Sequence, residues 1–192
     1  MEHLVIDVSE LGELTDEKLF RLCAANQDIQ IERTEKGELI VMSPVGGESG
    51  YRETRLIFLL ELWSSQTKTG IVFSSSAGFT LKSKAMRASD ASWVSKDRWD
   101  QLSDKERKRF PPLCPDFVIE LMSESDRLGV AQDKMEEWMD NGCRLSWLID
   151  PYSEKAYIYR EDGSRDVISS FYEKLSGENV LKGFELPLDE LR

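Results

Sequence analysis

Histidine is almost missing from this chain of 192 residues, which contains only His3. A single histidine at the amino-terminal end cannot supply the several imidazoles of a histidine metal site. Ser-His-Asp and Cys-His catalysis and the HExxH zinc proteases also need histidines placed within the fold. Any chemistry of this protein must therefore use carboxylates, lysine or hydroxyl groups.

Cysteine is scarce as well, and long hydrophobic runs are missing. Cys23, Cys114 and Cys143 are widely spaced and form no CxxC pair, which disfavours zinc ribbons and thioredoxin-like redox chemistry. We expect three reduced thiols in or near a core. No apolar run approaches the ~18 residues of a membrane span, and the first residues lack a signal-peptide pattern. We therefore expect a cytoplasmic protein with no membrane partner.

Basic residues are outnumbered: 25 Lys and Arg face 36 Asp and Glu, which gives a formal net charge of −11. This balance favours solubility and argues against a broad basic face for nucleic acid. A nucleic-acid enzyme of this composition needs a locally basic cleft. Residues 82–87 and 105–109 are short basic segments. Each of them either contacts phosphate or is simply solvated.

Hydrophobic periodicity predicts one mixed domain. Residues 1–14 look irregular, and the pattern predicts helices over 16–25, 48–67, 95–110 and about 128–140. Strands are predicted at 29–33, 38–42, 70–73, 78–81, 88–94, 117–122, 144–151, 156–160 and 167–168. Residues 116–149 form a strand, helix, strand unit, which favours a parallel pair. We predict an α/β or α+β protein with a central mixed sheet flanked by helices, in a single domain 1–192 with 1–28 as a helical extension.

Two acids interrupt the apolar strand before the last predicted helix. Asp116 and Glu120 are four residues apart, so strand alternation places their side chains on one face. A buried carboxylate is costly unless it is paired or bound to a metal. Two carboxylates on one face also repel each other, so a cation is their natural partner.

Lys134 lies in the predicted helix that follows this strand. If the helix begins near Leu128 and packs back along the strand, Lys134 lies about 9 Å into it. The same distance, counted back from the strand end near Ser123, reaches Glu120. Carboxylates that hold a cation, with a lysine that stabilises charge on phosphate, are typical of metal-dependent phosphodiester cleavage.

Several segments occur in an order that resembles a known family. They are Met42-Ser43-Pro44, Asp90-Ala91-Ser92-Trp93-Val94, the stretch from Pro115 to Ser123, Lys134, Asn141-Gly142 and Trp147-Leu148-Ile149-Asp150-Pro151. Together they cover roughly residues 30 to 160 and resemble the Uma-type family of restriction-endonuclease-like proteins, within the PD-(D/E)XK nuclease superfamily.

The resemblance implies a three-layer nuclease fold, Mg²⁺ (with Mn²⁺ as an alternative) and hydrolysis of DNA. It implies metal-binding roles for Asp90, Asp116 and Glu120. Lys134 resembles the motif lysine, displaced from strand to helix, and Glu48 resembles an acid contributed by the long helix. For Glu48 the alternative is a solvated first-turn acid favoured by the helix dipole. For Asp90 it is a strand-entry aspartate.

One distance limits the metal assignment. In a regular strand the Cα atoms of Asp116 and Glu120 are about 13 Å apart, too far to share one cation easily. Either Asp90 partners one of them, a bulge shortens the strand, or Asp116 has another role. We favour Asp90 and Glu120 as the core metal ligands.

The sequence departs from the common superfamily pattern at two places. Ser89 stands where a proline usually precedes the aspartate, and the lysine is not two residues after the glutamate.

Three functional classes follow from the sequence. The first is a metal-dependent DNA endonuclease. The second is a catalytically silent nuclease fold that binds DNA or regulates, which the acidic composition favours. The third is a protein–protein adaptor that acts as a homodimer.

Overall fold

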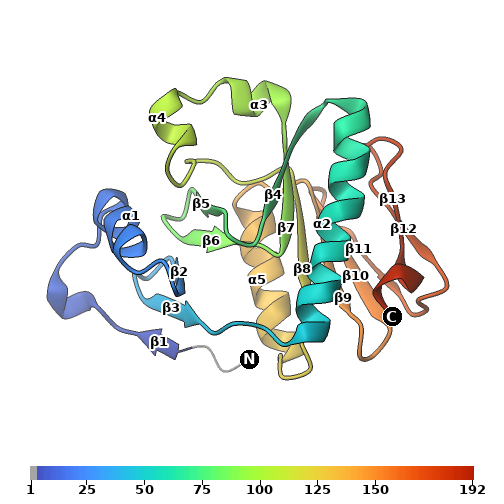
Figure 1. The fold of residues 1–192 in the computed structure, drawn as a ribbon, viewed down its shortest axis with the longest axis horizontal. Coiled ribbons are helices and arrows are strands. Elements are labelled where there is room, and N and C mark those ends of the chain that lie inside the picture. Colours follow the sequence, from blue (N-terminus) through green and yellow to red (C-terminus); the bar gives the residue numbers. More distant parts are fainter. Residues whose placement is uncertain (1–3) are drawn as a thin grey trace.

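The computed structural model describes residues 4–192 as a mixed α/β fold (Figure 1). The helices are α1 (Asp16–Ala25), α2 (Gly47–Thr67), α3 (Lys96–Asp100), α4 (Asp104–Arg107) and α5 (Leu128–Asp140), with two 3-10 turns, η1 (Ser9–Leu11) and η2 (Leu188–Leu191). The strands are β1 (Leu4–Ile6), β2 (Gln30–Arg33), β3 (Leu39–Met42), β4 (Gly70–Ser74), β5 (Gly78–Thr80), β6 (Met86–Ala88), β7 (Ala91–Ser95), β8 (Phe117–Leu121), β9 (Leu145–Asp150), β10 (Lys155–Arg160), β11 (Arg165–Ile168), β12 (Lys174–Ser176) and β13 (Glu185–Pro187).

The central sheet has six strands in the order β11-β10-β9-β8-β7-β4. Strands β8 and β9 pair in parallel, with Phe117 opposite Leu145 and Leu121 opposite Ile149, and α5 connects them. The predicted strand, helix, strand unit is therefore confirmed. The neighbouring pairs of this sheet are antiparallel, so the sheet is mixed as the sequence pattern predicts.

A second sheet of five strands, in the order β1-β3-β2-β6-β5, extends to one side of the central sheet (Figure 1). Strands β2 and β3 form the predicted hairpin, and Gly37 takes the left-handed conformation that its turn requires (φ 88°). Strand β1 pairs with β3, so the expectation that residues 1–14 are irregular is wrong for Leu4–Ile6. Its backbone pairing to β3, rather than any alternation in so short a segment, makes it a strand.

The predicted single strand over residues 88–94 is wrong. The chain leaves the five-stranded sheet at Ala88, the end of β6, and enters the central sheet at Ala91, the start of β7. Ser89 and Asp90 form the link between the two sheets. Asp90 therefore lies where the sheets meet, a position that strand periodicity could not reveal.

The predicted helix over residues 95–110 is also divided. Helix α3 ends at Asp100 and α4 begins at Asp104. The break is set by Ser103, whose hydroxyl accepts from the amide of Glu106 while the Glu106 carboxylate accepts from the amide of Ser103. This capping box starts a new helix at that point.

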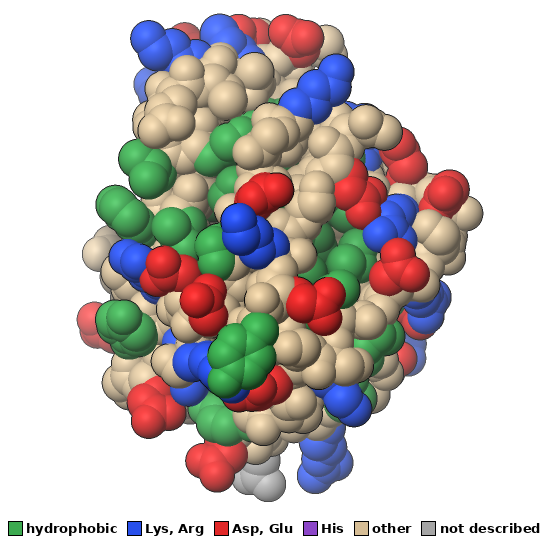
Figure 2. All heavy atoms as spheres, turned by 90° about the vertical axis from the view of Figure 1, so that its right-hand side faces the viewer, with side chains coloured by type: hydrophobic (Ala, Val, Ile, Leu, Met, Phe, Trp, Pro, Cys, Tyr) green, Lys and Arg blue, Asp and Glu red, His purple; other side chains and the backbone are tan. Residues whose placement is uncertain are grey.

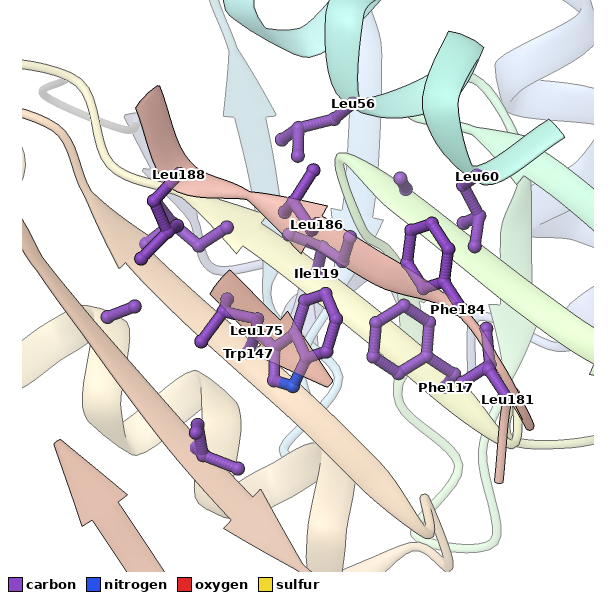
Figure 3. Packing of buried hydrophobic residues seen from close by; sticks show 14 of the residues in the cluster. Leu56, Leu60, Phe117, Ile119, Trp147, Leu175, Leu181, Phe184, Leu186 and Leu188 are labelled. Atoms are coloured by element: carbon purple, nitrogen blue, oxygen red, sulfur yellow. The ribbon is translucent and has the colours of Figure 1, made fainter. Parts of the chain in front are cut away.

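The core lies on both faces of the central sheet. On one face, Leu56 and Leu60 of α2 and the carboxy-terminal segment cover Phe117, Ile119 and Trp147 (Figure 3). The Phe117 and Trp147 rings are 4.7 Å apart in a T-shaped arrangement, and Phe184 stacks on Trp147 at 5.9 Å, as ring centroids. These contacts fix β8, the strand that carries Glu120.

On the other face, Met135 and Trp138 of α5 pack on Val118 and Leu148. Strand alternation directs Glu120 to this same face, beneath α5. Among residues 4–192, no helix combines the length and apolar character needed to cross a membrane.

Candidate catalytic site

Glu120 is the centre of a buried polar group beneath α5. Its side chain is only 11% exposed, and both of its oxygens have partners. Trp138 donates its indole N–H to Oε1 at 2.8 Å, while the Lys134 ammonium lies 3.0 Å from Oε1 and 3.1 Å from Oε2. The structure thus brings Lys134 level with Glu120, as the strand and helix rises predict.

Asp90 reaches the same place from the link between the two sheets. Its Oδ2 accepts the backbone N–H of Leu121, the residue after Glu120, at 2.6 Å. Burial raises the pKa of the Asp90 carboxyl to about 8, and the charge of Glu120 adds to this effect while Lys134 opposes it. Burial also raises the pKa of Glu120, although Lys134 partly offsets the increase. Two carboxylates that resist simultaneous ionisation mark a place where a cation is favourable.

The strand β2 contributes Glu32, which the sequence analysis missed. Its carboxylate is 3% exposed and accepts from the Lys134 ammonium at 3.3 Å and from the Ala88 amide at 3.0 Å. Arg87 donates to its other oxygen at 2.9 Å and also contacts Glu137 of α5 at 2.6 Å. The available signal was a charged residue in the middle of a short strand, directly after the apolar Ile31.

These opposite charges keep one another ionised. Burial alone would raise the pKa of Glu32, but Lys134 and Arg87 outweigh it, so the pKa lies below its usual value. Burial alone would lower the pKa of Lys134, but Glu120, Glu32 and Asp90 outweigh it, so the pKa is raised. Lys134 is therefore a fixed ammonium in the site at neutral pH.

Helix α2 presents a different glutamate from the one that the sequence suggested. The Glu48 side chain is 79% exposed, and its carboxylate forms an ion pair with Arg52 of the same helix at 3.4 Å. Glu53, five residues further on, faces the site instead: its charge raises the pKa of Asp90, and its Oε1 accepts from the Ser75 hydroxyl. Because five residues rotate by about 140° beyond one full turn, the two glutamates lie on different faces of α2.

Asp116 lies at the opposite end of β8, away from Glu120. Its carboxylate is 2% exposed, pairs with Arg98 at 2.9 Å and with Arg144 at 4.0 Å, and accepts the amide of Ser95 at 2.8 Å. Of the three explanations offered by the ~13 Å spacing, these contacts favour a separate role for Asp116. It ties α3 to the start of β8 and β9.

Replacement of Asp116 by alanine is expected to lower the free energy of unfolding by about 1.5–3 kcal/mol, because a buried hydrogen bond to a charged group is lost. Urea denaturation followed by circular dichroism measures the change. Glu48→Ala is the matched control, since removal of an exposed carboxylate should alter stability by no more than about 0.5 kcal/mol. Equal stability of the two variants would contradict a structural role for Asp116.

The donor set suits a hard divalent cation. Among the described residues 4–192, no three His, Cys, Asp or Glu side chains are grouped so that they could hold a metal ion. Mg²⁺, however, is commonly bound by one or two carboxylates, with water and substrate phosphate as its other ligands. Asp90 and Glu120, whose pKa values are both raised, meet this smaller requirement.

A cleft of about 690 Å³ opens on the outer side of the Arg87–Glu137 ion pair. It lies between the β2–β3 turn, the Lys82-Ser83 turn and the outer face of α5. Acidic side chains outnumber basic ones in its lining, and neither Asp90 nor Glu120 belongs to it. This cleft is therefore separate from the carboxylate site.

Comparisons with known proteins agree with this fold. The model of the Uma2 family, described as putative restriction endonuclease, matches residues 16–189. The fold is similar to that in a crystal structure described as a putative nuclease belonging to DUF820 from Anabaena variabilis ATCC 29413. That similarity has a TM-score of 0.71 at 16% sequence identity, and it covers 84% of this chain and 88% of the other. A comparison with curated proteins gives no match.

Proposed function

The chain belongs to the Uma2 family of restriction-endonuclease-like proteins, and we propose that it is a Mg²⁺-dependent endonuclease that hydrolyses phosphodiester bonds in DNA. The coarser conclusion, a protein of a nuclease family with a nuclease-like fold, rests on the family match and on the structural neighbour. The requirement for Mg²⁺, DNA as the substrate and hydrolysis as the reaction are what we propose beyond it.

One observation carries the proposal: the Lys134 ammonium contacts Glu120 at 3.0 Å while Asp90 binds the next residue along the same strand. A lysine beside two carboxylates of raised pKa is the minimal equipment for metal-assisted phosphodiester hydrolysis. Asp116, engaged with Arg98, is left out of the proposed ligand set.

In this proposal Asp90 and Glu120 would hold the cation. The bound cation would lower the pKa of a water molecule and offset charge on phosphate. Trp138 holds Glu120 in one orientation through its indole N–H, and Lys134 would supply a fixed positive charge to a phosphate bound at this cation. A preorganised cation of this kind stabilises the charge that develops in the transition state.

The surface charge limits how DNA binds. On the face that carries α2 and the carboxy-terminal strands, Lys and Arg side chains alternate with Asp and Glu without forming a continuous basic area (Figure 2). Because the whole chain also carries a formal net charge of −11, affinity from phosphate contacts should be modest and lost at moderate salt. The three free cysteines agree with the expected cytoplasmic setting.

Glu120→Gln is expected to lower the rate of plasmid cleavage by about 100-fold or more, because it removes a charged metal ligand from the site. Supercoiled plasmid is incubated with Mg²⁺ or Mn²⁺, with EDTA as the metal-free control, and nicked and linear products are quantified. Glu48→Gln is the matched glutamate control and should cut at the wild-type rate.

The alternative, a DNA-binding or regulatory module without turnover, is favoured by the negative charge of the chain. Metal-independent binding with no cutting by the wild-type protein would establish it. Wild-type cutting that Glu120→Gln leaves unchanged would show that the carboxylate site is not the catalytic one.

A further inference from the structure

Glu32 is a buried carboxylate whose burial needs a reason. The residue is 2% exposed, and a carboxylate in such a position is costly unless each oxygen is paired. Its Oε1 accepts from the Ala88 amide and from the Lys134 ammonium, and its Oε2 accepts from Arg87. The charge is thus fully paired, and one of its partners is the lysine of the proposed site.

The Lys134 side chain depends on this partner for its position. Lysine has a flexible four-carbon stem, and its ordering costs about 2 kcal/mol of rotamer entropy. Three acceptors surround the ammonium: Glu120, Glu32 at 3.3 Å and the Ala88 carbonyl at 2.9 Å. Glu120 belongs to the central sheet, whereas Glu32 and Ala88 belong to β2 and β6 of the five-stranded sheet. The second sheet therefore helps to determine where the ammonium lies.

Arg87 holds Glu32 in turn. Its guanidinium bridges Glu32 at 2.9 Å and Glu137 at 2.6 Å. The Glu32 carboxylate is thus held by Arg87 at Oε2 and by Lys134 and the Ala88 amide at Oε1. The bridge spans β6, β2 and α5, which are brought together only by the tertiary fold. A carboxylate clamped in this way can act as a rigid anchor for a flexible lysine.

We propose that Glu32 is a positioning residue that acts through Lys134, holding its ammonium against Glu120 for phosphodiester cleavage. This inference rests on the proposed nuclease function, which it deepens. Glu32 contacts the proposed site through the Lys134 ammonium, and its charge also raises the pKa of Glu120. The roles of Glu32 and Lys134 should therefore be non-additive.

A double-mutant cycle on plasmid cleavage tests this dependence. Glu32→Gln keeps the shape but removes the charge, and it should lower kcat by about 10–100-fold with little change in KM, as expected for a supporting partner of a site residue. In a Lys134→Met background the same substitution should cause no further loss. An equal fold-loss in both backgrounds would overturn the inference, because it would show that Glu32 acts on the fold in general. Glu35→Gln, an exposed glutamate of the same hairpin, is the control and should be silent.

A second measurement does not depend on activity. The ammonium ¹H–¹⁵N signal of Lys134, assigned by its loss in Lys134→Met, should shift or vanish in Glu32→Gln and persist in Glu35→Gln. An unchanged signal in Glu32→Gln would overturn the positioning role even if cleavage falls. If the wild-type protein cuts no DNA with any metal, the proposed function fails, and the ammonium signal alone decides the role of Glu32.

A conservative variant covers the case in which Glu32→Gln does not fold. Glu32→Asp keeps the negative charge but withdraws the carboxylate by one methylene from Lys134, Arg87 and the Ala88 amide. It should melt near the wild-type temperature and show an intermediate loss of kcat. Full wild-type activity in Glu32→Asp, together with an unmoved ammonium signal, would contradict the inference.

Discussion

Lys134→Met is expected to lower the rate of DNA cleavage by about 10²–10³-fold, the usual cost of removing one preorganised charge-stabilising donor from an active site. The ammonium contacts Glu120 at 3.0 Å and Glu32 at 3.3 Å, and its raised pKa keeps it charged throughout the useful pH range. Methionine fills a similar volume but supplies no charge. Single-turnover cleavage of plasmid in Mg²⁺ measures the loss.

The same substitution should also affect stability. It leaves Glu120 and Glu32 without their shared cation, and breaking a buried ion pair costs about 3–5 kcal/mol. Arg87 still pairs with Glu32, and Trp138 still donates to Glu120, so we expect the lower end of this range. Rates must therefore be compared well below the melting temperature of the variant.

Lys82→Met is the matched control for this experiment. Lys82 is exposed at the edge of the cleft beside α5 and makes no contact with Glu120. Its loss should change neither the cleavage rate nor the melting temperature appreciably. A folded Lys134→Met protein that cuts at the wild-type rate would refute the role of this lysine.

Asp90→Asn is expected to stabilise the metal-free protein at pH 8 while it abolishes cleavage. The pKa of Asp90 is about 8 in the folded protein and about 3.9 in the unfolded chain, so the folded state holds the proton more tightly between these values. Stability that protonation provides below pH 4 is consequently lost as the pH rises towards 8. Asparagine cannot ionise and escapes this loss.

The gain should be about 2–5 kcal/mol at pH 8, since each pKa unit corresponds to about 1.4 kcal/mol. This amounts to a rise of several degrees in melting temperature for a chain of this size. Differential scanning calorimetry in EDTA across pH 4–9 measures it, and the curves of wild type and variant should converge at low pH. Asp28→Asn, at an exposed position, should follow the wild-type curve.

Added Mn²⁺ should reverse the order of stability. A cation that binds only the folded state stabilises it by mass action, and the wild type should gain more than Asp90→Asn. A less stable Asp90→Asn protein at pH 8 in EDTA would contradict the ionisation argument. A site that is strained until its cation binds would be an instance of stability given up for function.

The sequence by itself determined the mixed fold class, the β8–α5–β9 unit and the meeting of Glu120 with Lys134. These features depend on local periodicity and on fixed rises along a helix and a strand, so the order of residues is sufficient. Fourteen residues separate Lys134 from Glu120, and one short connection leaves little freedom in their register.

Only the tertiary structure decided the rest of the site. Glu32 and Lys134 are 102 residues apart, and no local pattern connects them. The choice of Glu53 over Glu48 depends on which face of α2 packs on the central sheet. Asp116 is kept apart from the carboxylate site because it pairs with Arg98, which α3 brings to it. Contacts of this kind arise when two sheets and a helix pack together, because the pairing of buried charges is settled by which chain segments become neighbours.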